Sequence, residues 1–150
     1  MKLLIFGCGR TGAALARQMA NRGHDVTMVE QDIRALDRLG DSAAVRSIIG
    51  DGLNETVLEE AGIREADAFI TTTRGDNTNL MAAQIAQKRY SVPKVCAKVN
   101  DPQRAAEYKK LGVMCITPNL LTAGMMRNWL LDEAYGPVDE FNDLDEEGVI

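Results

Sequence analysis

Short apolar runs alternate with amphipathic segments along nearly the whole chain. Runs of consecutive apolar residues are typical of strands that are buried on both faces of a sheet. Six such runs predict strands at Lys2–Phe6, Asp25–Glu30, Ala44–Ile49, Ala66–Thr72, Lys94–Val99 and Val113–Thr117. Strands of this kind, separated by helices, indicate an α/β fold with a parallel sheet covered on both faces.

The segments between these strands carry helix signals. Apolar residues recur at helical spacing around Leu15, and Gly23 ends that helix. Asp32 and Asn54 are suited to cap the starts of two shorter helices, and Pro102 suits the first position of another. The predicted helices span residues 10–22, 32–40, 54–62, 78–89, 101–112 and 120–134.

The first strand-to-helix turn contains the motif Gly7-x-Gly9-x-x-Gly12. Gly7 permits a sharp turn, Gly9 lets backbone N–H groups approach a pyrophosphate, and Gly12 lets the helix lie close to the sheet. The second strand ends in Glu30, whose carboxylate is placed to accept hydrogen bonds from ribose hydroxyls and to repel a 2′-phosphate. These features predict a Rossmann-like, doubly wound sheet with strand order 3-2-1-4-5-6.

Polar residues follow the predicted strands at the edge where such sheets bind ligands. Asp51 is placed to accept from an adenine amino group, and Arg10 and Lys98 are placed to meet the same phosphate oxygens. Structural alternatives are a turn residue for Asp51, a strand end for Thr72 and Thr73, and a solvated helix start for Arg10. The candidate binding set is Gly7, Gly9, Arg10, Thr11, Gly12, Glu30, Gln31, Asp51, Gly52, Thr72, Thr73, Arg74, Asp76, Asn77, Lys98 and Asn100.

Composition narrows the class of protein. The 150 residues are 45% hydrophobic, which fits one globular domain, and no apolar run is long enough to span a bilayer. The net charge of −5 argues against nucleic acid as a partner, and the absence of an export signal predicts a cytosolic protein. Cys96 and Cys115 are expected to be buried thiols, whereas Cys8 is expected to be the one open to oxidation. Residues 136–150 are expected to be a solvated acidic tail or the start of a further domain.

Catalytic groups are scarce in the predicted cleft. A dehydrogenase needs an acid or base beside the nicotinamide, but His24 follows the first helix, at the opposite end of the sheet. Tyr90 and Lys94 have the spacing of a catalytic pair, yet Pro93 separates them and breaks any shared helix. We therefore predict a nucleotide-binding domain without enzymatic activity and without a metal site. A small NAD-dependent oxidoreductase, or a detached cofactor domain of one, is the alternative.

The last predicted helix has more apolar residues than one buried stripe can hold. Leu120, Leu121 and Leu131 occur beside three larger anchors, Met125, Met126 and Trp129. A second copy of the same helix is the simplest partner for the excess surface, so the sequence predicts at least a homodimer. The alternative is a helix wrapped wholly on its own domain.

Several motifs together resemble the TrkA-N, or RCK/KTN, family. They are Gly7-Cys8-Gly9-Arg10-Thr11-Gly12, Gly50-Asp51-Gly52, Phe69 to Leu80, Ala97 to Pro102, and Leu111-Gly112-Val113, and the similarity covers about residues 1–135. The resemblance implies a domain that binds NAD(H), AMP, ADP or ATP and gates a membrane-embedded potassium channel or transporter. It also implies dimers or rings whose last helix crosses to a neighbour, located at the inner face of the membrane.

The resemblance also implies roles for individual residues. Arg10 and Lys98 would contact phosphates, Glu30 the ribose and Asp51 the adenine, with the loop from residue 72 to 76 over the nucleotide. Many relatives have an acidic residue after the proline that ends the sixth strand, where this chain has Asn119. That difference favours a dinucleotide, or a mono- or diphosphate, over a metal-bound triphosphate. Family members usually continue into a smaller ligand domain, so this chain is expected to be a minimal subunit or an excised domain.

Overall fold

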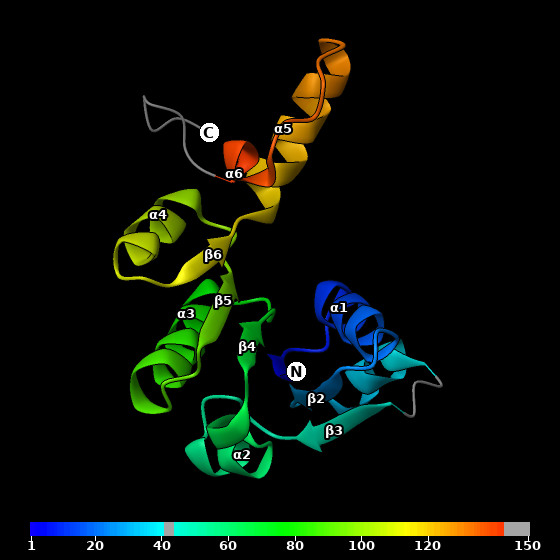
Figure 1. Cartoon of the computed structure of the whole chain (residues 1–150), viewed down its shortest axis with the longest axis vertical. Helices are drawn as coiled ribbons and strands as arrows, with labels where there is room; N and C mark the ends of the chain where they lie inside the picture. Colours follow the sequence, from blue (N-terminus) through cyan, green and yellow to red (C-terminus); the bar gives the residue numbers. More distant parts are fainter. Residues whose placement is uncertain (41–43, 143–150) are drawn as a thin grey trace.

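The chain folds around one six-stranded parallel sheet with the order β3-β2-β1-β4-β5-β6 (Figure 1). The computed structural model describes residues 1–40 and 44–142. The strands are β1 Lys2–Phe6, β2 Asp25–Glu30, β3 Val45–Ile49, β4 Ala68–Thr71, β5 Lys94–Lys98 and β6 Met114–Ile116. Both the fold class and the strand order predicted from the sequence are confirmed.

Helices connect consecutive strands, and two more helices follow the last strand. They are α1 Arg10–Ala20, η1 Ile33–Leu39, α2 Glu55–Glu60, η2 Ile63–Glu65, α3 Asp76–Gln84, η3 Ile85–Arg89, α4 Pro102–Lys110, α5 Pro118–Leu130 and α6 Val138–Phe141. The segment after β2 is a 3-10 helix, capped as expected by the Asp32 side chain on the Arg34 N–H. The helix predicted over residues 78–89 begins earlier, at Asp76, and its last turn is π-helical.

The core forms on both faces of the sheet because alternate strand residues point to opposite sides. On one face, Leu3 and Ile5 pack against the alanines of α1 and against η1. On the other face, Leu4 and Phe6 pack with residues of α2 and α3, and α4 covers the end near β6. Small residues on α1 bring that helix close to the strands, which places its first turn directly at the end of β1.

The end of the sheet at β6 is less well covered. Cys115 faces α4 and is buried, whereas Met114 and Ile116 face the other way and are 47% and 37% exposed. An apolar strip therefore remains partly open on the face that α1 and η1 cover at the opposite end of the sheet.

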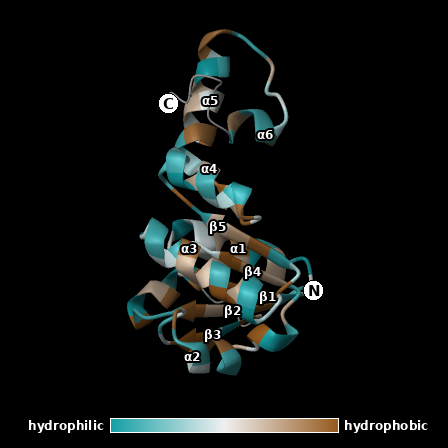
Figure 2. Ribbon diagram, turned by 90° about the vertical axis from the view of Figure 1, so that its left-hand side faces the viewer, coloured by the Kyte–Doolittle hydropathy of each residue, from teal (hydrophilic) through white to brown (hydrophobic). Residues whose placement is uncertain are grey.

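Helix α5 extends away from the sheet beyond β6 (Figures 1 and 2). It begins at Pro118, before the predicted start at residue 120. It also ends at Leu130, before the predicted end at residue 134, because the buried Asn128 side chain donates 2.9 Å to the Ala134 carbonyl and turns the chain back. The following segment carries α6 alongside α5, with the Phe141 ring against Gly124. Asn142 then bonds to the Thr117 N–H and the Cys115 carbonyl, both at 2.8 Å, and ties the segment to β6.

Candidate nucleotide-binding site

The glycine-rich turn joins β1 to α1 in a conformation that its glycines make accessible. Gly7 has a φ of 105°, which strongly favours glycine. A methyl group on Gly12 would overlap the Gly7 carbonyl oxygen and the Thr72 hydroxyl. That hydroxyl donates 2.7 Å to the Gly7 carbonyl and so fastens the turn to the end of β4. The turn is held rigidly, with the N-terminus of α1 facing the carboxyl edge of the sheet.

Glu30 fastens the same turn from the other side. One carboxylate oxygen accepts from the Cys8 N–H at 2.7 Å, and the other accepts from the N–H groups of Gln31 at 2.8 Å and Asp32 at 3.0 Å. These bonds fix the carboxylate at the end of β2, where its remaining lone pairs can accept from hydroxyl groups. The position is the one that the sequence predicted for a ribose acceptor.

A cavity of about 870 Å³ opens between the ends of β1, β2, β4 and β5. This volume is within the range of small-molecule sites. Its lining brings together ten of the predicted residues: Gly7, Gly9, Arg10, Thr11, Glu30, Gln31, Thr72, Thr73, Arg74 and Lys98. The cavity is also lined by residues absent from the predicted set, namely Phe6, Cys8, Asp32, Ala35, Arg38, Gly75 and Thr78.

Four cationic side chains line the cavity. Arg10 begins α1, Arg74 lies in the β4–α3 loop and Lys98 ends β5, whereas Arg38 is in η1, on the Glu30 side. Partial burial lowers the pKa of the Lys98 ammonium from its ordinary value, and the negative charge of Asp76 partly opposes this shift. The cavity is suited to an anionic ligand such as a phosphate ester.

Asn79 holds the β4–α3 loop against β5. It is fully buried, accepts from the Thr73 N–H at 2.9 Å, and donates to the Lys98 carbonyl at 2.8 Å. It therefore sets the distance between Thr73 and Lys98, two residues of the cavity. We did not predict it as a site residue because it makes its contacts from inside the protein. The sequence signal for Asn79 is its place in the motif from Phe69 to Leu80.

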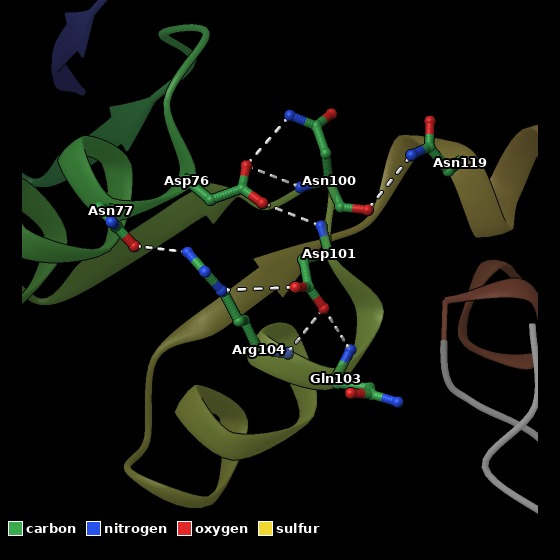
Figure 3. Close-up of polar contacts among 7 residues, drawn as sticks. All are labelled: Asp76, Asn77, Asn100, Asp101, Gln103, Arg104 and Asn119. Atoms are coloured by element: carbon green, nitrogen blue, oxygen red, sulfur yellow. Dashed lines mark hydrogen bonds and ion pairs between the residues drawn. The ribbon is translucent and has the colours of Figure 1, made fainter.

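The other predicted site residues lie outside the cavity lining. Gly12 is beneath the turn, and Gly52 lies against the Phe6 ring with no room for a Cβ. The Asp51 carboxylate accepts from the Leu53 N–H at 2.9 Å in the exposed turn after β3. The remaining three, Asp76, Asn77 and Asn100, belong to a polar cluster beside the cavity (Figure 3). Their participation in ligand binding stays a prediction.

Asp76 is the centre of that cluster. Its carboxylate accepts from the Asn100 N–H at 2.9 Å, the Asn100 amide at 3.0 Å and the Asp101 N–H at 2.9 Å (Figure 3). Asn119, in the first turn of α5, donates to the Asn100 carbonyl at 3.2 Å, and Arg104 donates to Asn77. The start of α3, the β5–α4 loop and the start of α5 are therefore connected through Asp76 and Asn100.

The groups that could have supplied enzymatic chemistry lie elsewhere. His24 is 3.3 Å from the amino group of Met1, at the amino end of the sheet. Tyr90 ends η3 and donates 3.1 Å to Glu59, while Lys94 begins β5, so they do not form a pair on one helix. Within residues 1–40 and 44–142, no three His, Cys, Asp or Glu side chains are grouped to hold a metal ion.

The cysteine prediction was wrong for two of the three thiols. Cys8 is fully buried, and burial together with the nearby Glu30 charge raises its pKa. Cys115 is buried as expected, but Cys96 is only partly buried because its face of the sheet is incompletely covered. Burial raises the pKa of the Cys96 thiol to about 11. Cys8 therefore contributes its backbone to the turn and is shielded from oxidants.

Comparison with known proteins decides the family. The TrkA-N domain matches residues 3–118, which is most of the chain. The chain belongs to the TrkA-N domain family. The match begins in β1 and ends at the start of α5, so this TrkA-N domain includes the whole sheet and every residue of the cavity lining.

Individual TrkA proteins are similar in sequence to most of this chain. The chain is 38% identical over 138 residues to the Trk system potassium uptake protein TrkA of Streptomyces coelicolor, covering 92% of this chain and 62% of the relative. It is 37% identical over 131 residues to a TrkA homolog of Methanothermobacter thermautotrophicus, covering 84% and 58%. The chain thus spans about three fifths of the length of these relatives.

Solved structures have the same fold at low sequence identity. The TrkA-N domain of the inner membrane protein ybaL from Escherichia coli matches with a TM-score of 0.77 at 19% identity, covering 86% of this chain and 96% of that one. The Kef CTD of Shewanella denitrificans, in AMP bound form, matches at 0.72 and 20%, covering 94% and 86%. The GsuK channel bound to NAD matches at 0.64 and 19%, covering 76% and 21%.

Proposed function

We propose that this TrkA-N domain binds an adenine nucleotide and regulates a membrane potassium transport system. The observation that carries the proposal is the 870 Å³ cavity, where the glycine-rich turn, Glu30 and Lys98 meet. The AMP and NAD bound to the Kef and GsuK relatives support a nucleotide of the same class here. The names of the TrkA relatives support potassium uptake as the process that is regulated.

Residues in and beside the cavity would each bind a different part of the nucleotide. The N–H groups of the glycine turn, with Arg10 and Lys98, would hold the phosphates, because a helix N-terminus and fixed cations favour anions. Glu30 would accept from the ribose hydroxyls, and Asp51 would reach the adenine. The loop from residue 72 to 76 would close over the ligand.

NAD(H), AMP and ADP are favoured over ATP with a metal ion. Asn119 occupies the position after Pro118 and donates its amide to the Asn100 carbonyl at 3.2 Å. An amide supplies no negative charge for a metal-bound triphosphate. Because Glu30 would repel a second phosphate on the ribose, NAD is expected to bind more tightly than NADP.

Assembly into at least a dimer would cover the exposed apolar surface of the chain. Trp129 and Leu130 on α5 are 70% and 71% exposed, and Met125 and Met126 are exposed beside them. The open apolar strip of Met114 and Ile116 on the sheet offers a second surface of the same kind. A second copy would cover both surfaces through a two-fold contact, and further copies would form a ring.

Binding of a nucleotide in the cavity would regulate transport by shifting the position of α5. Lys98 and the loop after β4 contact the ligand, and the Asp76 to Asn100 to Asn119 hydrogen bonds lead from there to α5. A change at α5 would alter the dimer and pull on a membrane-embedded potassium channel or transporter. The domain would then act in the cytoplasm, at the inner face of the membrane. Within residues 1–40 and 44–142, no helix has the length and apolar character to cross a membrane itself.

Incubation with NADH separates a regulatory domain from an oxidoreductase. Purified protein mixed with NADH and a panel of hydroxy acids, aldehydes and ketones should leave the NADH absorbance unchanged, because His24, Tyr90 and Lys94 all lie outside the cavity lining. Binding of NADH is monitored in the same samples by fluorescence. Steady oxidation that is abolished by Tyr90→Phe or Lys94→Ala would overturn the proposal in favour of a reductase.

A further inference from the structure

Arg38 brings a positive charge to the same corner of the cavity as Glu30. Its side chain comes from the last turn of η1 and lines the cavity with Ala35 and Glu30. The Nη1 atom lies 3.5 Å from the Cys8 carbonyl oxygen, while Glu30 accepts from the Cys8 N–H at 2.7 Å. The guanidinium and the carboxylate therefore flank one residue of the glycine-rich turn.

The donors of Arg38 are only weakly used within the protein. Nη1 is 3.4 Å from the Ala35 carbonyl as well as 3.5 Å from that of Cys8, and both distances exceed the usual range for N–H···O bonds. In the described part of the chain no carboxylate forms an ion pair with it. Arg34, one turn earlier, pairs with Asp32 at 3.3 Å and is 86% exposed.

Neighbouring groups hold the backbone of η1 beside the glycine-rich turn. Arg17 of α1 donates to the Arg38 backbone carbonyl, which anchors the end of η1 to α1 and adds a second positive charge nearby. Ala35, on the same side of η1, is buried, and its small side chain leaves room for the guanidinium to reach the turn. This part of the cavity therefore carries charges of both signs.

We propose that Arg38 is a specificity-determining residue that binds an anionic group at the 2′ position of the nucleotide's ribose. The inference rests on the proposed function, because it assigns a role within the same cavity. In Rossmann folds, a carboxylate after the second strand selects the free 2′-hydroxyl, whereas a nearby arginine accommodates a 2′-phosphate. This chain has both, so Arg38 offsets part of the repulsion from Glu30: a nucleotide with a 2′-phosphate still binds, although less tightly than one with a free 2′-hydroxyl.

Two ligands that differ only in the 2′-phosphate test the proposal. The dissociation constants of AMP and adenosine 2′,5′-bisphosphate are measured by calorimetry for the wild type, Arg38→Gln and Arg34→Gln. Arg38→Gln should weaken the bisphosphate by about tenfold, as loss of a charge-assisted hydrogen bond does, and leave AMP within about twofold. Arg34→Gln removes the same charge from the same helix and should change neither. Thermal unfolding of both variants confirms that the fold is kept.

Three outcomes would overturn the assignment. Equal weakening of both ligands by Arg38→Gln would place the guanidinium at a shared group, such as the 5′-phosphate. An unchanged bisphosphate affinity would mean that Arg38 makes no contact with the ligand. The same effect in Arg34→Gln would show that the weaker binding comes from the loss of one positive charge and not from a contact made by Arg38. If the wild type bound neither ligand, the proposed function itself would fail, and this inference with it.

Discussion

Two glycines of the β1–α1 turn are needed for different reasons, Gly12 for packing and Gly9 for the approach of a ligand. Gly12 is required by packing, since a side chain there would overlap the Gly7 carbonyl oxygen and the Thr72 hydroxyl. Around Gly9 the nearest atom to a new Cβ would be the Thr72 carbonyl oxygen, at 3.8 Å, an ordinary contact. The fold therefore has room at Gly9, and only a ligand that approaches the backbone would need that room.

Substitution of these two glycines by alanine should give opposite results. Gly12→Ala should lower the free energy of unfolding by about 1–3 kcal/mol, the usual cost of overpacking. Gly9→Ala should leave stability nearly unchanged and weaken AMP and NAD binding, because the methyl group stands where the phosphates approach. Urea unfolding and calorimetric titration measure the two effects. A Gly9→Ala variant that binds as tightly as the wild type would contradict the placement of the phosphates.

Lys98 predicts how binding depends on pH. Partial burial lowers the pKa of its ammonium, so the side chain loses its proton at a lower pH than free lysine does. A phosphate binds the protonated form, so nucleotide affinity should fall as the pH rises toward this lowered pKa. Lys98→Arg, whose guanidinium stays charged, should flatten the dependence. Titrations with AMP from neutral to alkaline pH test this, and identical profiles for the two proteins would contradict it.

The sequence revealed those residues whose role depends on local order along the chain. The glycine motif and Glu30 could be recognised because a strand, a turn and a helix follow one another with fixed spacing. Asn79 and Arg38 could not be recognised, because each acts on a segment that is distant in sequence. Asn79 bonds to the Lys98 carbonyl, and Arg38 lies against the Cys8 carbonyl. Only the packing of α3 and η1 on the sheet creates these contacts.

Among the elements, α5 is the one whose end the pattern of apolar residues predicted least accurately. Apolar residues continue past Leu130, so periodicity alone extended the helix to residue 134. The Asn128 bond to the Ala134 carbonyl and the positive φ of Asp132 end it earlier. The strands were predicted more accurately because their apolar runs are bounded by turns. Pairing with neighbours shortened the fourth strand to Ala68–Thr71.

The connection from the cavity to α5 can be followed with Trp129, the single tryptophan of the chain. Saturating AMP should change the Trp129 fluorescence of the wild type. Asn119→Ala removes the donor to the Asn100 carbonyl and should reduce that change by at least about half, while the AMP affinity stays the same. Arg104→Ala disrupts the exposed contacts to Asn77 and Asp101 in the same cluster, and it should keep the full response.

The outcome that would contradict this connection is a full fluorescence response in Asn119→Ala. That result would mean that α5 responds through packing rather than through Asn119. A wild type that binds AMP without any change at Trp129 would remove the coupling altogether, although nucleotide binding itself would stand.

At the scale of the whole molecule, the exposed apolar surface predicts a homodimer. Burial of one large apolar side chain contributes about 1.5–3 kcal/mol, and α5 exposes several. Light scattering at micromolar concentration should give at least twice the mass of one chain for the wild type. Trp129→Asp should shift it toward the monomer. Ile33→Asp places the same charge at another exposed apolar position, on η1, and should leave the mass unchanged.

A wild type that scatters as a monomer under these conditions would contradict the dimer. Equal dissociation by Ile33→Asp would show that added charge, rather than loss of the α5 contact, separates the chains.

Binding of an adenine nucleotide through Glu30 is the property on which the proposed function of this cavity rests. Calorimetric titration of NAD, AMP and NADP into the wild type and Glu30→Gln tests it. We expect one nucleotide per chain, NAD tighter than NADP, and a loss of about 1–3 kcal/mol for NAD and AMP in Glu30→Gln. Absence of saturable binding by the wild type, or equal affinity for NAD in the two proteins, would contradict it.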